Sequence, residues 1–213
     1  MKLVIFDMDG LLFDTERPSF RALKEASERR HFTFTIENYK QLIGLPHGKS
    51  RDALEKMYEG KFPYEEVIEE YREGFRRILT DEGIGIKPGV KQLLDAIDGR
   101  RMKKCIASSS SRETIAAYLK QTGLEDRFDF YISGNEVKNG KPYPDIFLEA
   151  CKIAGEPVES ALVLEDSLNG LKAASAAGIR CVLVPDLIEP TIEIEEMAFR
   201  ICDDLEKVIA LLE

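Results

Sequence analysis

The sequence predicts an α/β fold: a doubly wound, mostly parallel, Rossmann-like sheet with a small α-helical domain inserted into it. Three observations predict this fold. Short apolar runs recur without alternating polar residues, as strands covered on both faces of a parallel sheet require. From about residue 100 onward, these runs alternate with helical patterns. Residues 15–83 hold only helical patterns, although one strand precedes them.

The strands and helices of the predicted sheet can be read in order. Six runs have the length and hydrophobicity of strands: residues 3–6, 104–107, 128–132, 161–164, 181–184 and, more weakly, 200–202. Helical spacing of apolar residues marks five segments beyond residue 84: 90–97, 112–122, 143–154, 168–177 and 205–212. Gly123, Gly155 and Gly178 each follow one of these helices, as glycines that end helices do.

The helical insert follows the first strand. Its apolar residues recur at spacings of three and four in four segments: 19–30, 36–43, 51–58 and 64–79. Its far boundary is the stretch 83–89, whose glycines and proline suit a hinge and the start of the next helix. We therefore expect two domains, an α/β catalytic core of residues 1–14 and 84–213 and a helical domain of residues 15–83.

Composition limits the partners and the compartment. The 213 residues carry 30 basic and 39 acidic side chains, a net charge of −9. This charge disfavours a nucleic-acid or anionic-membrane surface, and no apolar run has the length of a membrane span, so we expect neither partner. The short apolar N-terminal run is broken by Asp7 and Asp9, unlike a signal peptide, and the four cysteines form no C-x-x-C pair. We expect a cytoplasmic protein with buried thiols, monomeric or else dimeric.

The first strand ends in two carboxylates. Asp7 and Asp9 stand two residues apart, so in an extended chain both point to the same side. Gly10 gives the backbone freedom to turn away at once. Ligands of open α/β sheets bind at this carboxyl edge, although an Asp-rich turn in solvent is the alternative. Because the chain has only two histidines, a metal bound here would be a hard cation with carboxylate ligands.

Three further strand ends carry residues suited to a phosphate. Residues 108–111 are four serines before a helix, where hydroxyl and N–H groups bind oxyanions. Lys141 lies in a Gly-Lys-Pro turn, and Glu165 and Asp166 precede another helix. Each segment alone could be ordinary turn or capping chemistry, with Asp166 as a helix cap. Four such segments at the carboxyl ends of strands favour a single site.

These segments, in this order, resemble the four motifs of the haloacid dehalogenase-like hydrolase superfamily, and more narrowly of its phosphatase and β-phosphoglucomutase-like branch. Asp7-Met8-Asp9-Gly10 with Asp14 resembles the first motif and Ser108 the second. Lys141 resembles the third, and Glu165-Asp166-Ser167 with Gly170 the fourth. The helical insert is similar to the cap domain of that family, so the resemblance covers essentially the whole chain.

The resemblance implies a Mg²⁺-dependent phosphatase that hydrolyses small phosphate monoesters, such as sugar phosphates, through an aspartyl-phosphate intermediate. Asp7 is then the nucleophile, and Asp9 is the general acid and base. A carboxylate that approaches a phosphate dianion is repelled, and a divalent cation offsets that repulsion. For its acid role, the side chain of Asp9 must lie outside the metal shell.

The same resemblance implies the binding residues. The metal group comprises the carboxylates of Asp7 and Asp166, the backbone carbonyl of Asp9, and Glu165 close by or orienting a water. The phosphoryl oxygens are implied to bind Ser108 and Lys141, with the N–H of Met8 or Ser109 assisting. Outside the four motifs, the candidates for substrate contact are Thr15 at the hinge, His47, Lys49 and Arg51 in a flexible cationic loop, and Arg112. Ordinary capping or surface exposure is the alternative for each of them.

Two other functions stay open. A β-phosphoglucomutase-like mutase would use the same core chemistry and return the phosphoryl group to a different hydroxyl. Ser19 stands where a histidine of the mutase is expected, and Ser111-Arg112 replace a Lys-Asn pair, which favours the phosphatase. A non-catalytic phosphate-binding protein is disfavoured because the nucleophile and the metal ligands are present. Haloacid dehalogenation needs neither a metal nor Asp9, so it is disfavoured too.

Overall fold

The computed structural model of the protein describes residues 1–45 and 47–212, with only the backbone of residues 47 and 48. The chain divides into two compact units. The core unit comprises Met1–Asp14 and Gly85–Glu213, and the helical unit comprises Thr15–Ile84. The second boundary therefore lies one residue later than the sequence suggests.

The core unit is built on a six-stranded sheet in the order β5-β4-β1-β6-β7-β8, in which every neighbouring pair is parallel. The strands are β1 (Leu3–Phe6), β4 (Lys103–Ser108), β5 (Phe130–Ser133), β6 (Ala161–Glu165), β7 (Arg180–Leu183) and β8 (Arg200–Ile201). This sheet confirms the predicted fold class. The strand order reverses at β1, where a doubly wound sheet opens its ligand-binding crevice.

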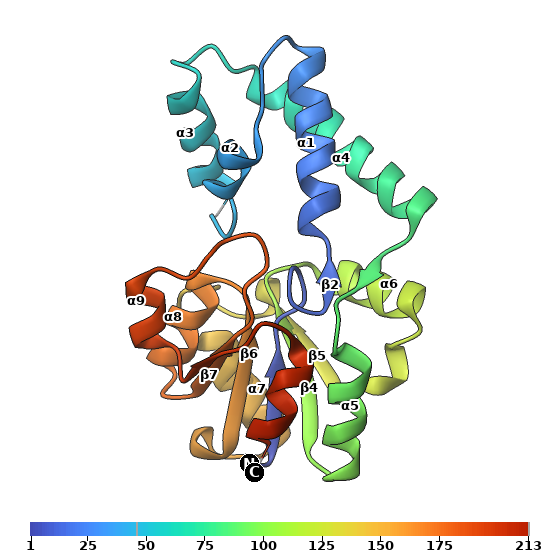
Figure 1. The fold of residues 1–213 in the computed structure, drawn as a ribbon, viewed down its shortest axis with the longest axis vertical. Helices are drawn as coiled ribbons and strands as arrows, with labels where there is room; N and C mark the ends of the chain where they lie inside the picture. Colours follow the sequence, from blue (N-terminus) through green and yellow to red (C-terminus); the bar gives the residue numbers. More distant parts are fainter. Residues whose placement is uncertain (46, 213) are drawn as a thin grey trace. The chain divides into compact units, whose positions relative to one another are not determined.

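Helices flank this sheet (Figure 1), and they are α5 (Val90–Gly99), α6 (Arg112–Thr122), α7 (Asp145–Ala154), α8 (Leu168–Ala176), α9 (Ile192–Met197) and α10 (Leu205–Val208). The sequence did not predict α9, because its glutamates alternate with isoleucines and hide the helical spacing. A two-stranded antiparallel ladder, also not found as a strand pattern, joins β2 (Phe13–Asp14) to β3 (Gly85–Ile86). This ladder lies where the chain leaves the core unit and returns to it.

The central strand β1 is buried on both faces. Leu3 and Ile5 belong to a cluster with the buried faces of α7 and α8. Val4 and Phe6, which alternate with them, are equally buried and face the opposite side of the sheet. A strand with no polar residue is stable only when helices cover both of its faces, as they do here.

The helical unit contains α1 (Glu16–Arg29), α2 (Ile36–Lys40), α3 (His47–Met57) and α4 (Tyr64–Glu82). Helices α1 and α4 pack against each other. They approach closely at Gly74, where an added Cβ would lie 3.7 Å from the Cβ of Ala22. Helix α2 begins with a capping box between Thr35 and Asn38.

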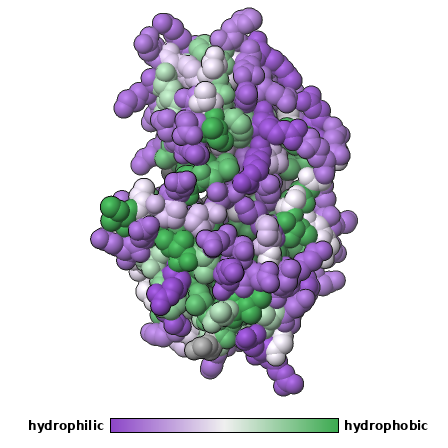
Figure 2. All heavy atoms as spheres, in the orientation of Figure 1, coloured by the Kyte–Doolittle hydropathy of each residue, from purple (hydrophilic) through white to green (hydrophobic). Residues whose placement is uncertain are grey.

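The face in view in Figure 2 is mostly hydrophilic, with hydrophobic residues in small separate groups. None of the helices in the described ranges combines the length and the apolar character that crossing a bilayer requires.

Candidate active site

Asp7 follows the central strand directly. Its N–H donates to the carbonyl of Leu164 at 3.0 Å, which extends the pairing of β1 with β6 by one residue. Gly10 then takes a φ of 83°, and the chain folds back so that the N–H groups of Leu12 and Phe13 donate to the carbonyl of Met8. The turn therefore fixes Asp7 at the carboxyl end of the strand at which the sheet order reverses.

Lys141 connects three strand ends. Its Nζ donates to Oδ1 of Asp7 at 2.5 Å, to Oε1 of Glu165 at 2.6 Å and to the carbonyl of Ala107 at 2.9 Å. These bonds use the three donors of an ammonium group. The Lys141 side chain is only 5% exposed, and a cis peptide bond to Pro142 follows it. One lysine thus joins the carboxyl ends of β1, β4 and β6.

Glu165 is fully buried at the end of β6. Its Oε2 accepts from the hydroxyl of Ser167 at 2.9 Å, from the N–H of Ser167 at 3.1 Å and from the N–H of Asp166 at 3.2 Å. The same Ser167 hydroxyl accepts from the N–H of Gly170 at 3.1 Å and so caps α8. Ser167, and not Asp166, is therefore the helix cap.

Gly170 makes room for the Glu165 carboxylate. A Cβ built on Gly170 would lie 1.8 Å from both Cδ and Oε1 of Glu165. No side chain fits at that distance, so the position of the carboxylate requires a glycine in the first turn of α8.

Burial and the charges of neighbouring groups together set the pKa values of the site. Burial raises the pKa of Asp7 to about 8, Lys141 opposes the rise, and Glu165 and Asp9 add to it. Burial lowers the pKa of Lys141, but the charges of Asp7 and Glu165 outweigh it, so the pKa of Lys141 is raised and the group stays an ammonium. Asp7, Glu165 and Asp166 each offer an oxygen within 4.8 Å of the others. These three carboxyl groups offer oxygen ligands to a further cation, whose charge would lower the pKa of Asp7 and favour its ionised form.

Asp9 lies beside this group and has different partners. Its Oδ2 accepts from the hydroxyl of Ser110 at 2.7 Å. The N–H of Ser110 donates to the Ser108 hydroxyl at 3.0 Å, and the hydroxyl of Ser133 donates to the Ser110 carbonyl at 2.7 Å. Ser108 is buried, whereas Ser109 is exposed. The loop after β4 is thus held by Ser108 and by Ser133 of β5, and its Ser110 orients the Asp9 carboxyl group.

The structure places the remaining candidates as follows. Thr15 is buried at the N-terminus of α1, and Lys49 is exposed on α3. Arg51 bonds to Glu55 and Glu65 within the helical unit. His47 begins α3, and its side chain lies outside the described part of the structure.

Arg112 begins α6 in the core unit. Its guanidinium bonds to Glu136 at 3.0 Å and lies over the ring of Tyr131, 4.5 Å from the ring centre. This arrangement ties α6 to the edge strand β5 and gives Arg112 a structural role.

Three residues of the site went unassigned in the sequence. These three residues lie within the sequence motifs: Ser110, Ser167 and Gly170. The sequence does not determine which serine bonds to which carboxylate. Ser110 is one of four consecutive serines, and only the fold selects it as the partner of Asp9. The spacing of Ser167 and Gly170 around a helix start was the available signal, because a serine three residues before a helical N–H is a capping pattern.

Comparisons with known proteins agree with this geometry. The model of the haloacid dehalogenase-like hydrolase family matches residues 4–184. A Bacillus subtilis protein named as a phosphatase, YhcW, is 33% identical over the whole chain and 96% of its own length. The phosphorylated carbohydrates phosphatase of Thermotoga maritima is 33% identical over 84% of this chain and 82% of its own.

Among solved structures, CbbY from Rhodobacter sphaeroides in complex with phosphate superimposes with a TM-score of 0.78 at 28% identity. The match covers 98% of this chain and 96% of that one. The fold, the ordered motifs and these relatives confirm the resemblance. The chain belongs to the haloacid dehalogenase-like hydrolase family, within its phosphatase branch.

Proposed function

We propose that the protein is a Mg²⁺-dependent phosphatase that hydrolyses small phosphate monoesters, sugar phosphates or similar metabolites, through an aspartyl-phosphate on Asp7. The observation that carries the proposal is the buried group of Asp7, Lys141 and Glu165, joined by bonds of 2.5 and 2.6 Å at the carboxyl edge of the sheet. A relative that hydrolyses phosphorylated carbohydrates supports the substrate class.

The donor set fits Mg²⁺, because it consists of carboxylate oxygens gathered within 4.8 Å. Both oxygens of Glu165 already accept hydrogen bonds from Lys141, Ser167 and Asp166. We therefore assign direct ligation to Asp7, to Asp166 and to the backbone carbonyl of Asp9, and give Glu165 the task of holding Lys141. When bound, the cation would offset the negative charge of the carboxylates and of the phosphoryl oxygens.

In the first step, a carboxylate oxygen of Asp7 attacks phosphorus as the P–O bond to the leaving group breaks. The protonated Asp9 gives its proton to the leaving oxygen, so an alcohol departs. Ser108 and Lys141 bind the phosphoryl oxygens, and Lys141 exchanges one of its three present bonds to do so. Ser110 holds Asp9 in place during the transfer.

In the second step, a water attacks the phosphorus of the aspartyl-phosphate. Asp9 takes the proton of that water, and the bond between phosphorus and the Asp7 oxygen breaks. Inorganic phosphate leaves, and both aspartates return to their starting protonation states.

The test is a phosphate-release assay over a panel of phosphorylated metabolites, with and without Mg²⁺, run beside an isomerisation assay on β-glucose 1-phosphate. We expect Mg²⁺-dependent release that Asp7→Asn abolishes and that Asp126→Asn, an exposed aspartate of the core unit, leaves unchanged. Isomer formation without net release would make the protein a mutase. Full turnover by Asp7→Asn would remove the nucleophile assignment.

A further inference from the structure

An ion pair of the core unit joins the residue after β3 to the loop after β7. The Lys87 ammonium donates to Oδ1 of Asp186 at 2.7 Å, across 99 positions of the chain. The side chain of Lys87 is 16% exposed and that of Asp186 only 2%, so the pair is largely shielded from solvent. Neither residue lies in the four motifs. A shielded, charge-assisted bond of this kind holds its two segments together more firmly than an exposed ion pair does.

The Lys87 end of this pair is bonded to the turn that carries Asp9. The N–H of Lys87 donates to the carbonyl of Leu12 at 2.9 Å, directly beyond the ladder of β2 and β3. The turn also closes on itself, because the N–H of Gly10 donates to the carbonyl of Phe13 at 3.0 Å and Asp9 forms a β-bridge with Phe13. The backbone from Asp9 to Phe13 is therefore fixed to the backbone of Lys87.

The Asp186 end of the pair lies close in the chain to a partner of Glu165. The N–H of Val184 donates to the carbonyl of Glu165 at 2.7 Å, which extends the pairing of β7 with β6 by one residue. Only Pro185, whose ring restricts the backbone, separates Val184 from Asp186. The carboxylate of Glu165 in turn accepts from Lys141 at 2.6 Å. Asp186 is thus anchored to the strand end that holds the buried ion pair of the site.

The two ends together place the general acid between two supports. The hydroxyl of Ser110 donates to the Asp9 carboxyl group at 2.7 Å and fixes the side chain. The pair of Lys87 and Asp186 fixes the backbone that carries this side chain, relative to the end of β6. A general acid must lie within hydrogen-bond reach of the leaving oxygen, and a displacement of about 1 Å can cost about 100-fold in rate.

We propose that Lys87 and Asp186 are positioning residues for the proton transfer by Asp9. The pair holds the turn of residues 9–13 against the carboxyl end of β6, so that the proton of Asp9 can pass to the leaving oxygen as the P–O bond breaks. The inference rests on the proposed function, because it concerns the first step of that reaction. It assigns to Lys87 and Asp186 no contact with substrate or metal.

Two phosphate esters distinguish the positioning of the acid from general damage to the site. The alcohol of glucose 6-phosphate needs the proton of Asp9 to leave, whereas p-nitrophenolate leaves p-nitrophenyl phosphate without one. We would measure kcat/KM on both esters, with Mg²⁺, for Lys87→Met, Asp186→Asn and Lys87→Arg. In the first two variants we expect a fall of about tenfold on glucose 6-phosphate and of less than about twofold on p-nitrophenyl phosphate. Lys87→Arg keeps the pair and should stay close to the wild type on both esters.

The matched control is Lys104→Met. The Lys104 side chain on β4 is 8% exposed and pairs with Asp98, so this variant also removes a shielded ammonium of the core unit. It should leave the ratio of the two kcat/KM values at that of the wild type. Because Lys87→Met leaves the buried Asp186 carboxylate without this cation, we would also measure Lys87→Met/Asp186→Asn and expect the same ratio from it. Equal losses on both esters, or the same change of ratio in Lys104→Met, would overturn the proposal.

Hydrogen exchange tests the same pair without catalysis. The N–H groups of Gly10, Leu12 and Phe13 are hydrogen-bonded within the turn. In metal-free protein, we expect the peptide of residues 8–14 to exchange about tenfold faster in Lys87→Met than in the wild type, relative to the peptide of α7, and to be unchanged in Lys104→Met. Unchanged exchange of this peptide in Lys87→Met would overturn the proposal. If the wild type hydrolyses no ester, the proposed function fails, while hydrogen exchange still decides whether the pair holds the turn.

Discussion

Replacing Gly170 with alanine is the most direct perturbation of the site geometry that leaves every polar group in place. The new Cβ would lie 1.8 Å from Cδ and Oε1 of Glu165, so the carboxylate must move. Four hydrogen bonds hold it, from the Lys141 ammonium, from the Ser167 hydroxyl and from two backbone N–H groups. A shift that clears the methyl group breaks the buried pair of Lys141 and Glu165.

The magnitude follows from two opposing effects. Breaking a buried ion pair costs about 3–5 kcal/mol. Alanine is a better helix former than glycine by about 1 kcal/mol, which offsets part of that loss. We expect the free energy of unfolding of Gly170→Ala to fall by about 2–4 kcal/mol. Because Lys141 also holds Asp7 and is displaced with its partner, kcat should fall by about 100-fold.

Urea unfolding followed by circular dichroism measures the stability, and phosphate release measures kcat. The matched control is Gly99→Ala on α5, where an added Cβ meets no atom within 4 Å. That variant should be unchanged or more stable by up to about 1 kcal/mol, with wild-type kcat. A Gly170→Ala protein with the wild-type unfolding midpoint and kcat would refute the claim that packing fixes Glu165.

Three further outcomes are expected. Ser110→Ala removes a hydrogen-bond donor to Asp9, so kcat should fall roughly tenfold while the urea midpoint stays close to that of the wild type. An unchanged kcat would show that Ser110 does not orient Asp9. Burial opposes the ionisation of Asp98, but the bonds of Asp98 to Lys104 and Arg127 outweigh this effect and lower its pKa. The ionised Asp98 therefore contributes its full stabilisation above the unfolded pKa near 3.8. This stabilisation is lost as the pH falls through the folded pKa. Asp98→Asn should therefore lose less stability than the wild type between pH 5 and pH 2 in acid unfolding, and parallel curves would contradict this. Removal of divalent cations with a chelator should abolish phosphate release, and added Mg²⁺ should restore it; turnover that persists in excess chelator would exclude the metal assignment.

The parallel sheet could be predicted because its strands are short runs of apolar residues, such as residues 161–164, with no polar alternation. The pattern failed where burial is one-sided or the element is very short. Helix α9 carries three glutamates in six residues, and β2 and β3 have only two residues each. Neither length nor periodicity can identify such elements.

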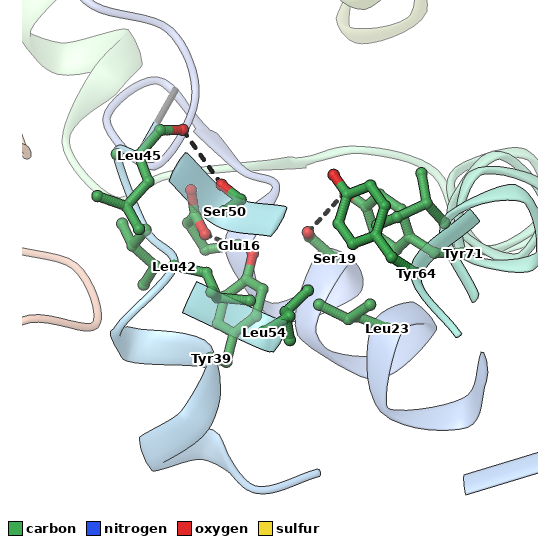
Figure 3. Close-up of a pocket in the computed structure, with 13 residues that line it drawn as sticks. Glu16, Ser19, Leu23, Tyr39, Leu42, Leu45, Ser50, Leu54, Tyr64 and Tyr71 are labelled. Carbon is green, nitrogen blue, oxygen red and sulfur yellow. Dashed lines mark hydrogen bonds between the residues drawn. The ribbon is translucent and has the colours of Figure 1, made fainter. Parts of the chain in front are cut away.

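The site also has a part that could be predicted from the sequence and a part that could not. Asp7 and Lys141 are 134 positions apart, yet each lies in a recognisable segment at a strand end, so their meeting could be expected from the sheet. The hydrogen-bond partners of Glu165 could not be predicted, because they depend on side-chain rotamers and on where α8 begins. The helical unit also contains a pocket lined by residues of α1, α2, α3 and α4 (Figure 3), which could not be predicted from the sequence for another reason. Its serines and tyrosines come from several helices, and no spacing connects Glu16 to Tyr39.

The central claim is that Asp7 carries the phosphoryl group. Asp9→Asn, which keeps the nucleophile but lacks the acid and base, should be mixed with a good phosphate ester and Mg²⁺, quenched in acid and analysed by mass spectrometry of its peptides. We expect the mass of one phosphoryl group on the peptide that contains Asp7, lost when Asp7 is also replaced by asparagine. A phosphoryl group on a different residue, or release of phosphate with no covalent intermediate at any time, would contradict the account.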